Sequence, residues 1–413
     1  MEPTRALRLV VIVAALLLLA GGWPAPEAAA QPARPVAAQP PTGSDTEPPG
    51  GTDSGTRRAD QAAGAARARA AAAEQQARAA AAEARRVAQL AANRQRVRAT
   101  WESRGRPARL VIVRDVSLDI VTQGRLTRRT PRRAGPLNLT TLSRYLPSSW
   151  LSIDGGTATL TAAVVLTPRV VLDIGGDVTT VKLTGGATLS QAASIYTGSG
   201  RILLHGVTIT SADPASGQPL TASPGRPFLV VTSGGRLDAS DVTATDLGTS
   251  DDGPRPRSAI QFNPGSTGSV VRSTFTRNSV GLQLDGSQDV RIEDVAVTES
   301  LGHGLATSRD SGTVLRGIRA ERNGGNGIRL NTTTTKEPIT GVSTAGNGRF
   351  GIAAIRLRDT RIEDMRANGD AAGGLELSQS TGVTVSGFAA TDEPAGVYAV
   401  SYTHLTLPTI LRV

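Results

Sequence analysis

The stretch "GLQLDGSQDVRIEDVAVTESLGHGLATS", residues 281–308, contains one full unit of an internal repeat. It opens on Gly281-Leu282 and reaches the same dipeptide, Gly304-Leu305, 23 residues later. Glycine followed by an apolar residue then recurs at spacings of 23, 24, 23 and 22 residues, at Gly327-Ile328, Gly351-Ile352, Gly374-Leu375 and Gly396-Val397. Self-similarity at a fixed period indicates a repeat architecture in which each unit stacks on the next.

The residues that follow each glycine alternate in polarity. After Gly281 the first and third residues are apolar (Leu282 and Leu284), and the second and fourth are polar (Gln283 and Asp285). This alternation predicts a β-strand with one buried face, and a second apolar run in each unit predicts one or two more short strands. Such a unit is too short for a propeller blade and lacks the helical half of a leucine-rich repeat. We therefore predict an all-β fold, a right-handed parallel β-helix solenoid with coils of about 23 residues stacked at the ~4.8 Å strand spacing.

Asparagines gather near the turn that precedes the next glycine. Stacked side-chain amides at such a position can hydrogen-bond along the solenoid axis. The expected members of this ladder are Asn278, Asn323, Asn347 and Asn368.

The segments before the repeat differ from it in composition. Residues 1–30 combine arginines, a short apolar run and small residues up to Ala30, which is typical of a secretory signal, with an uncleaved anchor as the alternative. Residues 31–56 are rich in Pro, Gly, Ser and Thr and predict a disordered linker. Residues 57–104 consist mostly of Ala and Arg and predict a long helical stem, a solvated spacer or a weak coiled coil that contacts the cell envelope. Residues 105–399 are the expected β-helix domain, in a secreted, periplasmic or envelope protein.

Residues 400–413 break the repeat pattern. Their first ten residues, "VSYTHLTLPT", resemble the in-frame translation of a transposase-type sequencing-library adapter. We expect this tail to be non-native, the natural chain to stop near Ala399 and one or more terminal coils to be missing. His404 is therefore not a candidate functional residue.

Charge is distributed unevenly along the chain. The formal net charge is +10, but residues 57–133 carry 19 basic and 6 acidic side chains, whereas residues 134–399 carry 22 and 24. The large domain is nearly neutral, so we expect no nucleic-acid partner for it. The absence of cysteine excludes thiol chemistry, and no metal or cofactor motif is recognisable. Asp251-Asp252 is expected to be a solvated loop pair.

The outward positions of adjacent coils should lie directly above one another. The second, fourth and fifth residues after each glycine then form a polar ladder on one long surface. Its members are Gln283, Asp285, Ser308, Arg309, Arg329, Asn331 and Arg356. Arginine forks bind carboxylates through two hydrogen bonds, so this surface suits a stretched polymer with repeated carboxylates. An ordinary polar surface of a β-helix is the alternative.

Two histidines of the domain receive structural roles. His303 directly precedes Gly304 and lies five positions out of step with Asp285, or roughly 16 Å along an extended strand. We expect His303 to be a turn or half-buried residue and not a partner of Asp285. His205 has no evident polar partner and is expected to be structural.

Three blocks of the chain resemble the periplasmic mannuronan (alginate) C5-epimerases, a family of secreted right-handed β-helix enzymes. They are "RVVLDIGGDVTTVKLTGG" (residues 169–186), the segment Gly225–Gly248, and "HGLATSRD" (residues 303–310), which is similar to the family's H-G-x-x-x-S-R-E stretch. The resemblance implies that Arg309 matches the arginine that assists at the substrate carboxylate. The family also has an Asp-Pro-His-Asp motif one coil earlier, where this chain has "GLQLDG" with Asp285 at the place of the catalytic histidine.

C5-epimerisation removes the proton next to a uronate carboxylate and returns one from the other face, which requires a base, a proton donor and a cation. The predicted catalytic residues are Arg309, as the cation, and Asp285, which would be a base only if burial made its carboxylate more basic. The predicted substrate-binding residues are Gln283, Ser308, Arg329, Asn331 and Arg356. Three functions remain open for an anionic polysaccharide partner: a uronan C5-epimerase, a lyase whose carbanion expels the C4 oxygen, and a binding homologue without catalysis.

Overall fold

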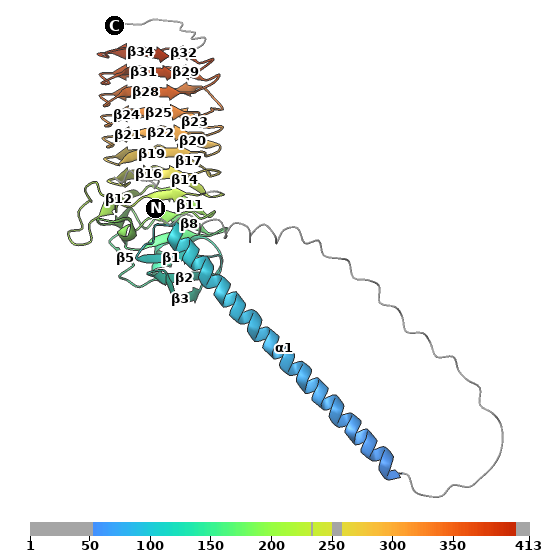
Figure 1. Cartoon of the computed structure of the whole chain (residues 1–413). Coiled ribbons are helices and arrows are strands. Elements are labelled where there is room, and N and C mark those ends of the chain that lie inside the picture. Colours follow the sequence, from blue (N-terminus) through green and yellow to red (C-terminus); the bar gives the residue numbers. More distant parts are fainter. Residues whose placement is uncertain (1–52, 233, 250–257, 402–413) are drawn as a thin grey trace, which may run out of the picture. The chain divides into compact units, whose positions relative to one another are not determined.

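The computed structural model describes residues 53–401 except 233 and 250–257 (Figure 1). The chain divides into two compact units, residues 1–78 and 79–413, with the boundary inside helix α1 (Asp53–Ser103). This helix begins inside the segment predicted to be a linker, because no proline after Pro49 prevents an earlier start. The predicted signal, most of the predicted linker, Asp251-Asp252 and residues 402–413 lie outside the described residues.

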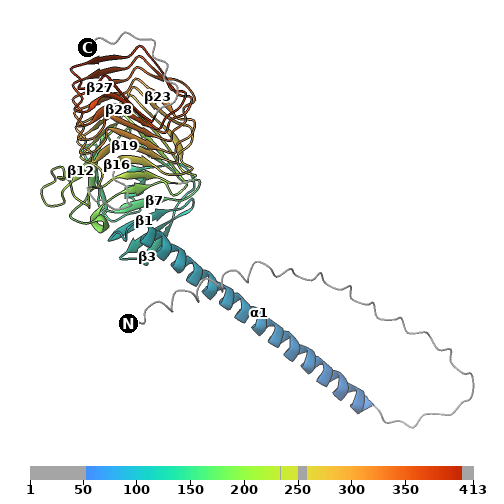
Figure 2. The same ribbon diagram turned by 45° about the horizontal axis from the view of Figure 1, so that its top comes forward.

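Residues 109–400 form a solenoid of stacked coils (Figures 1 and 2). The strands of successive coils pair into three sheets, which we name A, B and C. Sheet A has 13 strands: β3 (Arg125–Pro131), β2 (Ser117–Thr122), β1 (Arg109–Val113), β7 (Ala163–Leu166), β10 (Ile195–Tyr196), β13 (Leu229–Val231), β16 (Ser258–Phe262), β19 (Val280–Asp285), β22 (Leu305–Ser308), β25 (Ile328–Asn331), β28 (Phe350–Ile355), β31 (Gly373–Ser378) and β34 (Val397–Val400).

Sheet B has 10 strands: β4 (Leu137–Asn138), β8 (Val171–Ile174), β11 (Arg201–His205), β14 (Arg236–Ser240), β17 (Thr267–Val271), β20 (Val290–Glu293), β23 (Val314–Arg316), β26 (Ile339–Thr340), β29 (Arg361–Glu363) and β32 (Thr384–Ser386). Sheet C has 11 strands: β5 (Leu151–Asp154), β6 (Thr157–Leu160), β9 (Thr180–Thr184), β12 (Thr208–Ala212), β15 (Thr243–Thr245), β18 (Thr274–Thr276), β21 (Ala296–Thr298), β24 (Arg319–Glu321), β27 (Ser343–Ala345), β30 (Arg366–Asn368) and β33 (Ala389–Thr391). A short helix α2 (Leu139–Ser143) and a 3-10 turn (Leu189–Gln191) lie among the first strands.

The strand register confirms the predicted repeat and the right-handed parallel β-helix. Leu282 pairs with Leu305, Leu305 with Ile328, and Ile328 with Ile352, so the residue after each repeat glycine stacks in one file. These side chains are fully buried in one continuous apolar core between the three sheets. Figure 2 shows the successive coils lying over one another.

A polar ladder runs through the interior, as predicted for three of the four asparagines. Asn323 donates its amide to Asn347 (2.9 Å), and Asn347 donates in turn to the Asp370 carboxylate (2.7 Å). Asn278 is buried at the equivalent place and donates to a backbone carbonyl. The prediction for Asn368 was wrong: it lies on the exposed outer side of β30, and Asp370 occupies the ladder position in that coil.

The N-terminal end of the solenoid differs from a simple stack of coils. Strands β1, β2 and β3 form an antiparallel meander, which joins the parallel stack where β1 pairs with β7. The last turns of α1 cover the outer face of these first strands. Val97 of the helix is 1% exposed and packs with Ile112, Val165 and Phe228. Within the described residues, no helix combines the length and hydrophobicity needed to cross a membrane.

Candidate functional site on the outer face of sheet A

The outer face of sheet A collects most of the residues predicted to contact a polymer. Residues at the same position of successive strands stack in files along the solenoid. One file contains Gln283, Ala306 and Arg329, and a second contains Asp285, Ser308 and Asn331. Both files continue through β28 and β31. The structure therefore brings the predicted positions onto one face, at the spacing of neighbouring parallel strands (~4.8 Å).

Arg309 and Arg356 project from the corner where strands of sheet A end. Both have left-handed backbone conformations, with φ of +57° and +53°, and the same conformation recurs at Thr332 between them. Because this turn repeats in each coil, the side chains at the fifth position leave the solenoid at equivalent places. Arg356 donates to Asn331 Oδ1 (2.9 Å) and to Thr332 Oγ1 (3.3 Å), so the structure links two predicted binding residues directly.

Asp285 and Arg309 form an ion pair between adjacent coils. The Arg309 Nη2 atom lies 2.5 Å from Asp285 Oδ1, and the arginine side chain remains 67% exposed. The two predicted catalytic residues are thus side by side. The cation engages Oδ1 of the Asp285 carboxylate, whereas Oδ2 has no hydrogen-bond partner among the described residues. Arg309 has five N–H donors and keeps several of them for a ligand.

Asp310, to which sequence reasoning gave no role, fixes the turn beneath this ion pair. Its side chain is 2% exposed and accepts hydrogen bonds from Ser287 N–H (2.8 Å), Ser287 Oγ (2.7 Å) and Ser308 N–H (2.8 Å). Burial raises the pKa of the Asp310 carboxyl to about 6, although these hydrogen bonds favour the ionised form. Its place directly after Arg309 in "SRD" was the available signal, because Asx side chains stabilise turns.

His303 is half-buried, as predicted, and does not contact Asp285. Its Nδ1 atom accepts a hydrogen bond from the backbone N–H of Asn326 (3.0 Å). Burial, followed by the charges of Arg329 and Arg349, lowers the pKa of His303 to about 4, so the imidazole is neutral at pH 7. The neutral ring then carries its proton on Nε2. In this arrangement Nδ1 already accepts a hydrogen bond, and the lowered pKa makes the imidazole a weak base at neutral pH.

The prediction that His205 lacks a polar partner was wrong. His205 Nε2 lies 2.8 Å from Asp173 Oδ1, and both side chains are partly exposed on the outer face of sheet B. The partners are 32 residues apart because this coil is longer than the later ones, with Arg201 paired to Val171. A period of 23 residues could not reveal this contact.

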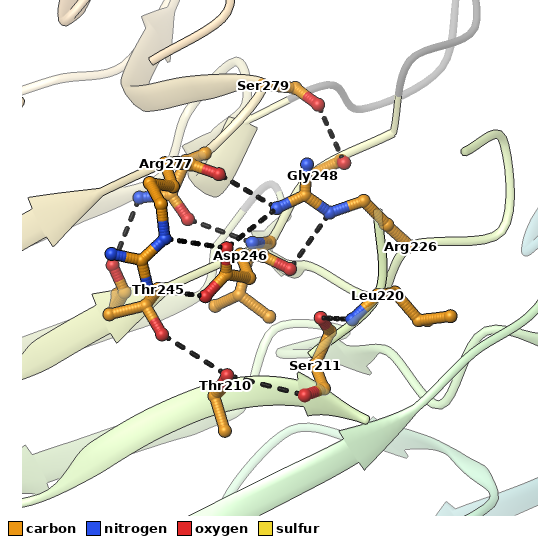
Figure 3. Close-up of polar contacts among 12 residues, drawn as sticks. Thr210, Ser211, Leu220, Arg226, Thr245, Asp246, Gly248, Arg277 and Ser279 are labelled. Atoms are coloured by element: carbon orange, nitrogen blue, oxygen red, sulfur yellow. Dashed lines mark hydrogen bonds and ion pairs between the residues drawn. The ribbon is translucent and has the colours of Figure 1, made fainter. Parts of the chain in front are cut away.

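The Gly225–Gly248 block surrounds a buried arginine (Figure 3). Arg226 is 2% exposed and donates to the carbonyls of Asp246 (2.9 Å) and Arg277 (2.8 Å). The Asp246 carboxylate is held by Arg277 (2.8 Å). Burial lowers the pKa of Arg226 to about 10, so it stays charged at neutral pH. These contacts join turns of neighbouring coils, which gives this block a structural role.

The fold defines a right-handed parallel β-helix protein that carries polar side chains along the outer face of sheet A and at the corner where its strands end. Residues 258–408 match the family model described as "Right handed beta helix region". No curated protein is significantly similar to the chain. Within the described residues, no group of three or more His, Asp or Glu side chains could hold a metal ion.

The chain is also similar to several solved β-helix structures. The periplasmic alginate epimerase AlgG is 15% identical, with 66% of this chain and 72% of that chain covered and a TM-score of 0.48. The A-module of the Azotobacter vinelandii mannuronan C-5 epimerase AlgE6 is 11% identical, with 61% and 89% covered and a TM-score of 0.38. PfbA, a surface adhesin of Streptococcus pneumoniae, is 10% identical, with 66% and 93% covered and a TM-score of 0.35.

Proposed function

We propose that the protein is exported and acts on an anionic polysaccharide along the outer face of sheet A, with uronan C5-epimerisation as its leading activity. The observation that carries the proposal is the placement of three arginines on three successive coils: Arg329 on the outer face of sheet A, and Arg309 and Arg356 at the corner where its strands end. A polymer laid along the solenoid would meet one guanidinium per coil.

The near-neutral charge of the β-helix domain means that a polyanion would have to be recognised by the local arrangement of charged side chains. Residues 134–399 carry 22 basic and 24 acidic side chains, so the domain has no general attraction for polyanions. Guanidiniums on successive coils would select a polymer that presents carboxylates at intervals, because each planar fork binds a carboxylate through two hydrogen bonds.

Arg309 would supply the cation that the leading activity requires. Charge develops on the uronate carboxylate as the neighbouring proton leaves, and a guanidinium at that oxygen stabilises it. When the substrate carboxylate takes over Arg309, the Asp285 carboxylate is released from its ion pair at the reacting face. It would then serve as the base, and expulsion of the C4 oxygen instead of reprotonation would make the protein a lyase.

A binding function without turnover is the second candidate. It is favoured by the ion pair that occupies Asp285 and by the hydrogen bond that occupies Nδ1 of His303. With Oδ1 of Asp285 paired to a cation and Nδ1 of His303 hydrogen-bonded, binding without proton transfer would account for the same surface.

Incubation of the full chain with polymannuronate in deuterated water separates these functions. Deuterium at C5 with inverted configuration supports the epimerase, and unsaturated ends that absorb in the ultraviolet support the lyase. Binding with neither product supports the non-catalytic protein. Absence of both binding and turnover across a panel of uronans would overturn the proposal.

A further inference from the structure

A cleft lies between helix α1 and the first residues of strand β3. Its volume is about 600 Å³, which is within the usual range of ligand-binding sites. Its apolar lining comes from Leu90, Val97 and Leu126. Leu90 is 49% exposed, so part of this apolar surface is open to a partner. None of the residues proposed to contact the polysaccharide lines the cleft, which makes it a separate site.

The charged side chains that line the cleft are all positive. They are Arg94 and Arg98 from the helix and Arg125 from the strand. Arg98 is paired with Glu102 (3.1 Å). Arg94 and Arg125 are exposed and form no ion pair or hydrogen bond with any described residue. A cleft with an apolar lining and an unpaired guanidinium from each wall is suited to a partner that combines apolar and acidic groups.

Contacts on both sides hold the walls of the cleft in place. The Arg129 guanidinium of β3 donates to Asn93 Oδ1 of the helix (3.0 Å). Val97 is buried against the first strands of sheet A. A Cβ atom on Gly124 would lie 2.9 Å from the Trp101 ring, so this glycine allows the turn before β3 to approach the helix. The cleft is therefore formed in the absence of a partner.

The strand that lines the cleft is an edge strand. β3 is the first strand of sheet A and pairs only with β2, so its other edge has backbone N–H and C=O groups that no described strand uses. The strand carries three arginines and no acidic residue. An extended peptide can add to such an edge through backbone hydrogen bonds while its side chains enter neighbouring pockets. A lipid chain has no backbone to pair with this edge, so the edge favours a peptide.

We infer that the cleft binds an extended acidic segment of a partner protein, which adds as a strand to β3. Apolar side chains of the segment would pack against Leu90 and Leu126, and its carboxylates would pair with Arg94 and Arg125. This interaction goes beyond the proposed function and does not depend on it, because no residue of the polysaccharide surface takes part.

The probe for this inference is the fluorescein-labelled peptide Glu-Val-Glu-Leu-Glu-Val-Glu, titrated with the full chain and followed by fluorescence anisotropy. Two control peptides separate the two kinds of contact. One has lysine in place of each glutamate, and the other has the same side chains with methylated backbone nitrogens. We expect the acidic peptide to bind and both control peptides to bind at least about tenfold more weakly.

A matched pair of double variants tests the role of the two unpaired arginines. Arg94→Gln/Arg125→Gln should weaken binding of the acidic peptide by about tenfold or more. Arg67→Gln/Arg69→Gln makes the same change in net charge at exposed positions of α1 outside the cleft and should leave the affinity unchanged.

A second pair of variants tests the apolar lining. Leu90→Ser should weaken binding of the peptide, because Leu90 lines the cleft. Val87→Ser makes a similar change on the same helix, at a residue that is exposed and does not line the cleft, and should have no effect.

Several results would overturn the inference. Equal losses in the two double variants would show that binding follows net charge, and wild-type affinity for the methylated peptide would exclude strand addition. Displacement of the peptide by polymannuronate or by phosphatidylglycerol vesicles would assign the arginines to another polyanion or to a membrane. A dimer in sedimentation equilibrium that Leu90→Ser dissociates would assign the cleft to a second copy of the chain.

Discussion

Arg309 combines a hydrogen-bonded backbone with an exposed side chain. Its amide donates to Asn331 O (2.9 Å) and its guanidinium crosses to Asp285, so the turn holds the side chain over the outer face. Replacement by lysine keeps the positive charge and removes the planar fork. Hydrogen bonds to charged groups are worth roughly 1.5–3 kcal/mol.

We therefore expect Arg309→Lys to weaken polyuronate binding by roughly tenfold to a hundredfold. Isothermal titration calorimetry with polymannuronate measures the change. Arg272→Lys is the control, since Arg272 pairs with Asp241 at a corner between sheets B and C. Equal affinities of wild type and Arg309→Lys would remove Arg309 from the binding surface.

Asp310 predicts a pH dependence of stability with a definite sign. Its pKa is about 6 in the folded protein against 3.8 as the ordinary value, so the folded state binds the extra proton between these pH values. Stability from this group is therefore greatest at low pH and falls as pH rises from about 4 to about 6. Asp310→Asn abolishes that contribution.

Urea titrations at several pH values test this sign, because the difference between the two proteins isolates Asp310 from other titrating groups. The free energy of unfolding of wild type should fall relative to that of Asp310→Asn across this window. A difference that grows in the opposite direction would show that the carboxyl is not desolvated in the folded state.

At the element scale, the internal ladder holds neighbouring coils in register. Asn347 accepts from Asn323 N–H and Nδ2 and donates to Asp370 and to Ala320 O, with its side chain almost completely buried. Removal of this amide leaves several buried polar groups unpaired, and each unpaired group lowers the free energy of unfolding by about 1–3 kcal/mol.

Asn347→Ala is expected to lower the free energy of unfolding by about 3 kcal/mol or more. Asn368→Ala should change it by less than about 0.5 kcal/mol, because Asn368 is exposed. Urea unfolding of both variants provides the comparison. Similar losses in the two proteins would contradict the assignment of the ladder to Asn347.

The end of helix α1 gives a second matched pair. Val97 is buried under the first strands of sheet A, whereas Val87 on the same helix is 55% exposed. Val97→Ala should lower the free energy of unfolding by about 1–3 kcal/mol through lost packing, and Val87→Ala should have little effect. Thermal unfolding detects the difference, and equal behaviour would mean that the helix end does not pack on the solenoid.

These elements also show what the sequence could predict. The strand positions from Gly281 onward were predictable because each coil repeats the same alternation at a nearly constant spacing. The sequence could not predict the antiparallel strands β1 to β3 or the longer coils around His205. These segments contain no repeat, and their contacts depend on loop length. The side-by-side placement of Asp285 and Arg309 followed from the repeat, whereas the orientation of the His303 ring depends on a hydrogen bond from Asn326 N–H that the sequence does not reveal.

At the scale of the whole molecule, the solenoid places equivalent sequence positions of successive coils next to one another on its surface. Arg309, Arg329 and Arg356 come from three successive coils. We propose that a linear polymer contacts all three together, so their contributions to the binding free energy should add along the solenoid axis.

The most direct test is the equilibrium affinity for polymannuronate of the triple variant Arg309→Gln/Arg329→Gln/Arg356→Gln. Its control is Arg358→Gln/Arg361→Gln/Arg366→Gln, which makes the same change in net charge at exposed arginines outside sheet A. We predict a loss of more than about a hundredfold in the first protein and near wild-type affinity in the second. Equal losses in both would show that binding follows net charge alone and would contradict a recognition surface on sheet A.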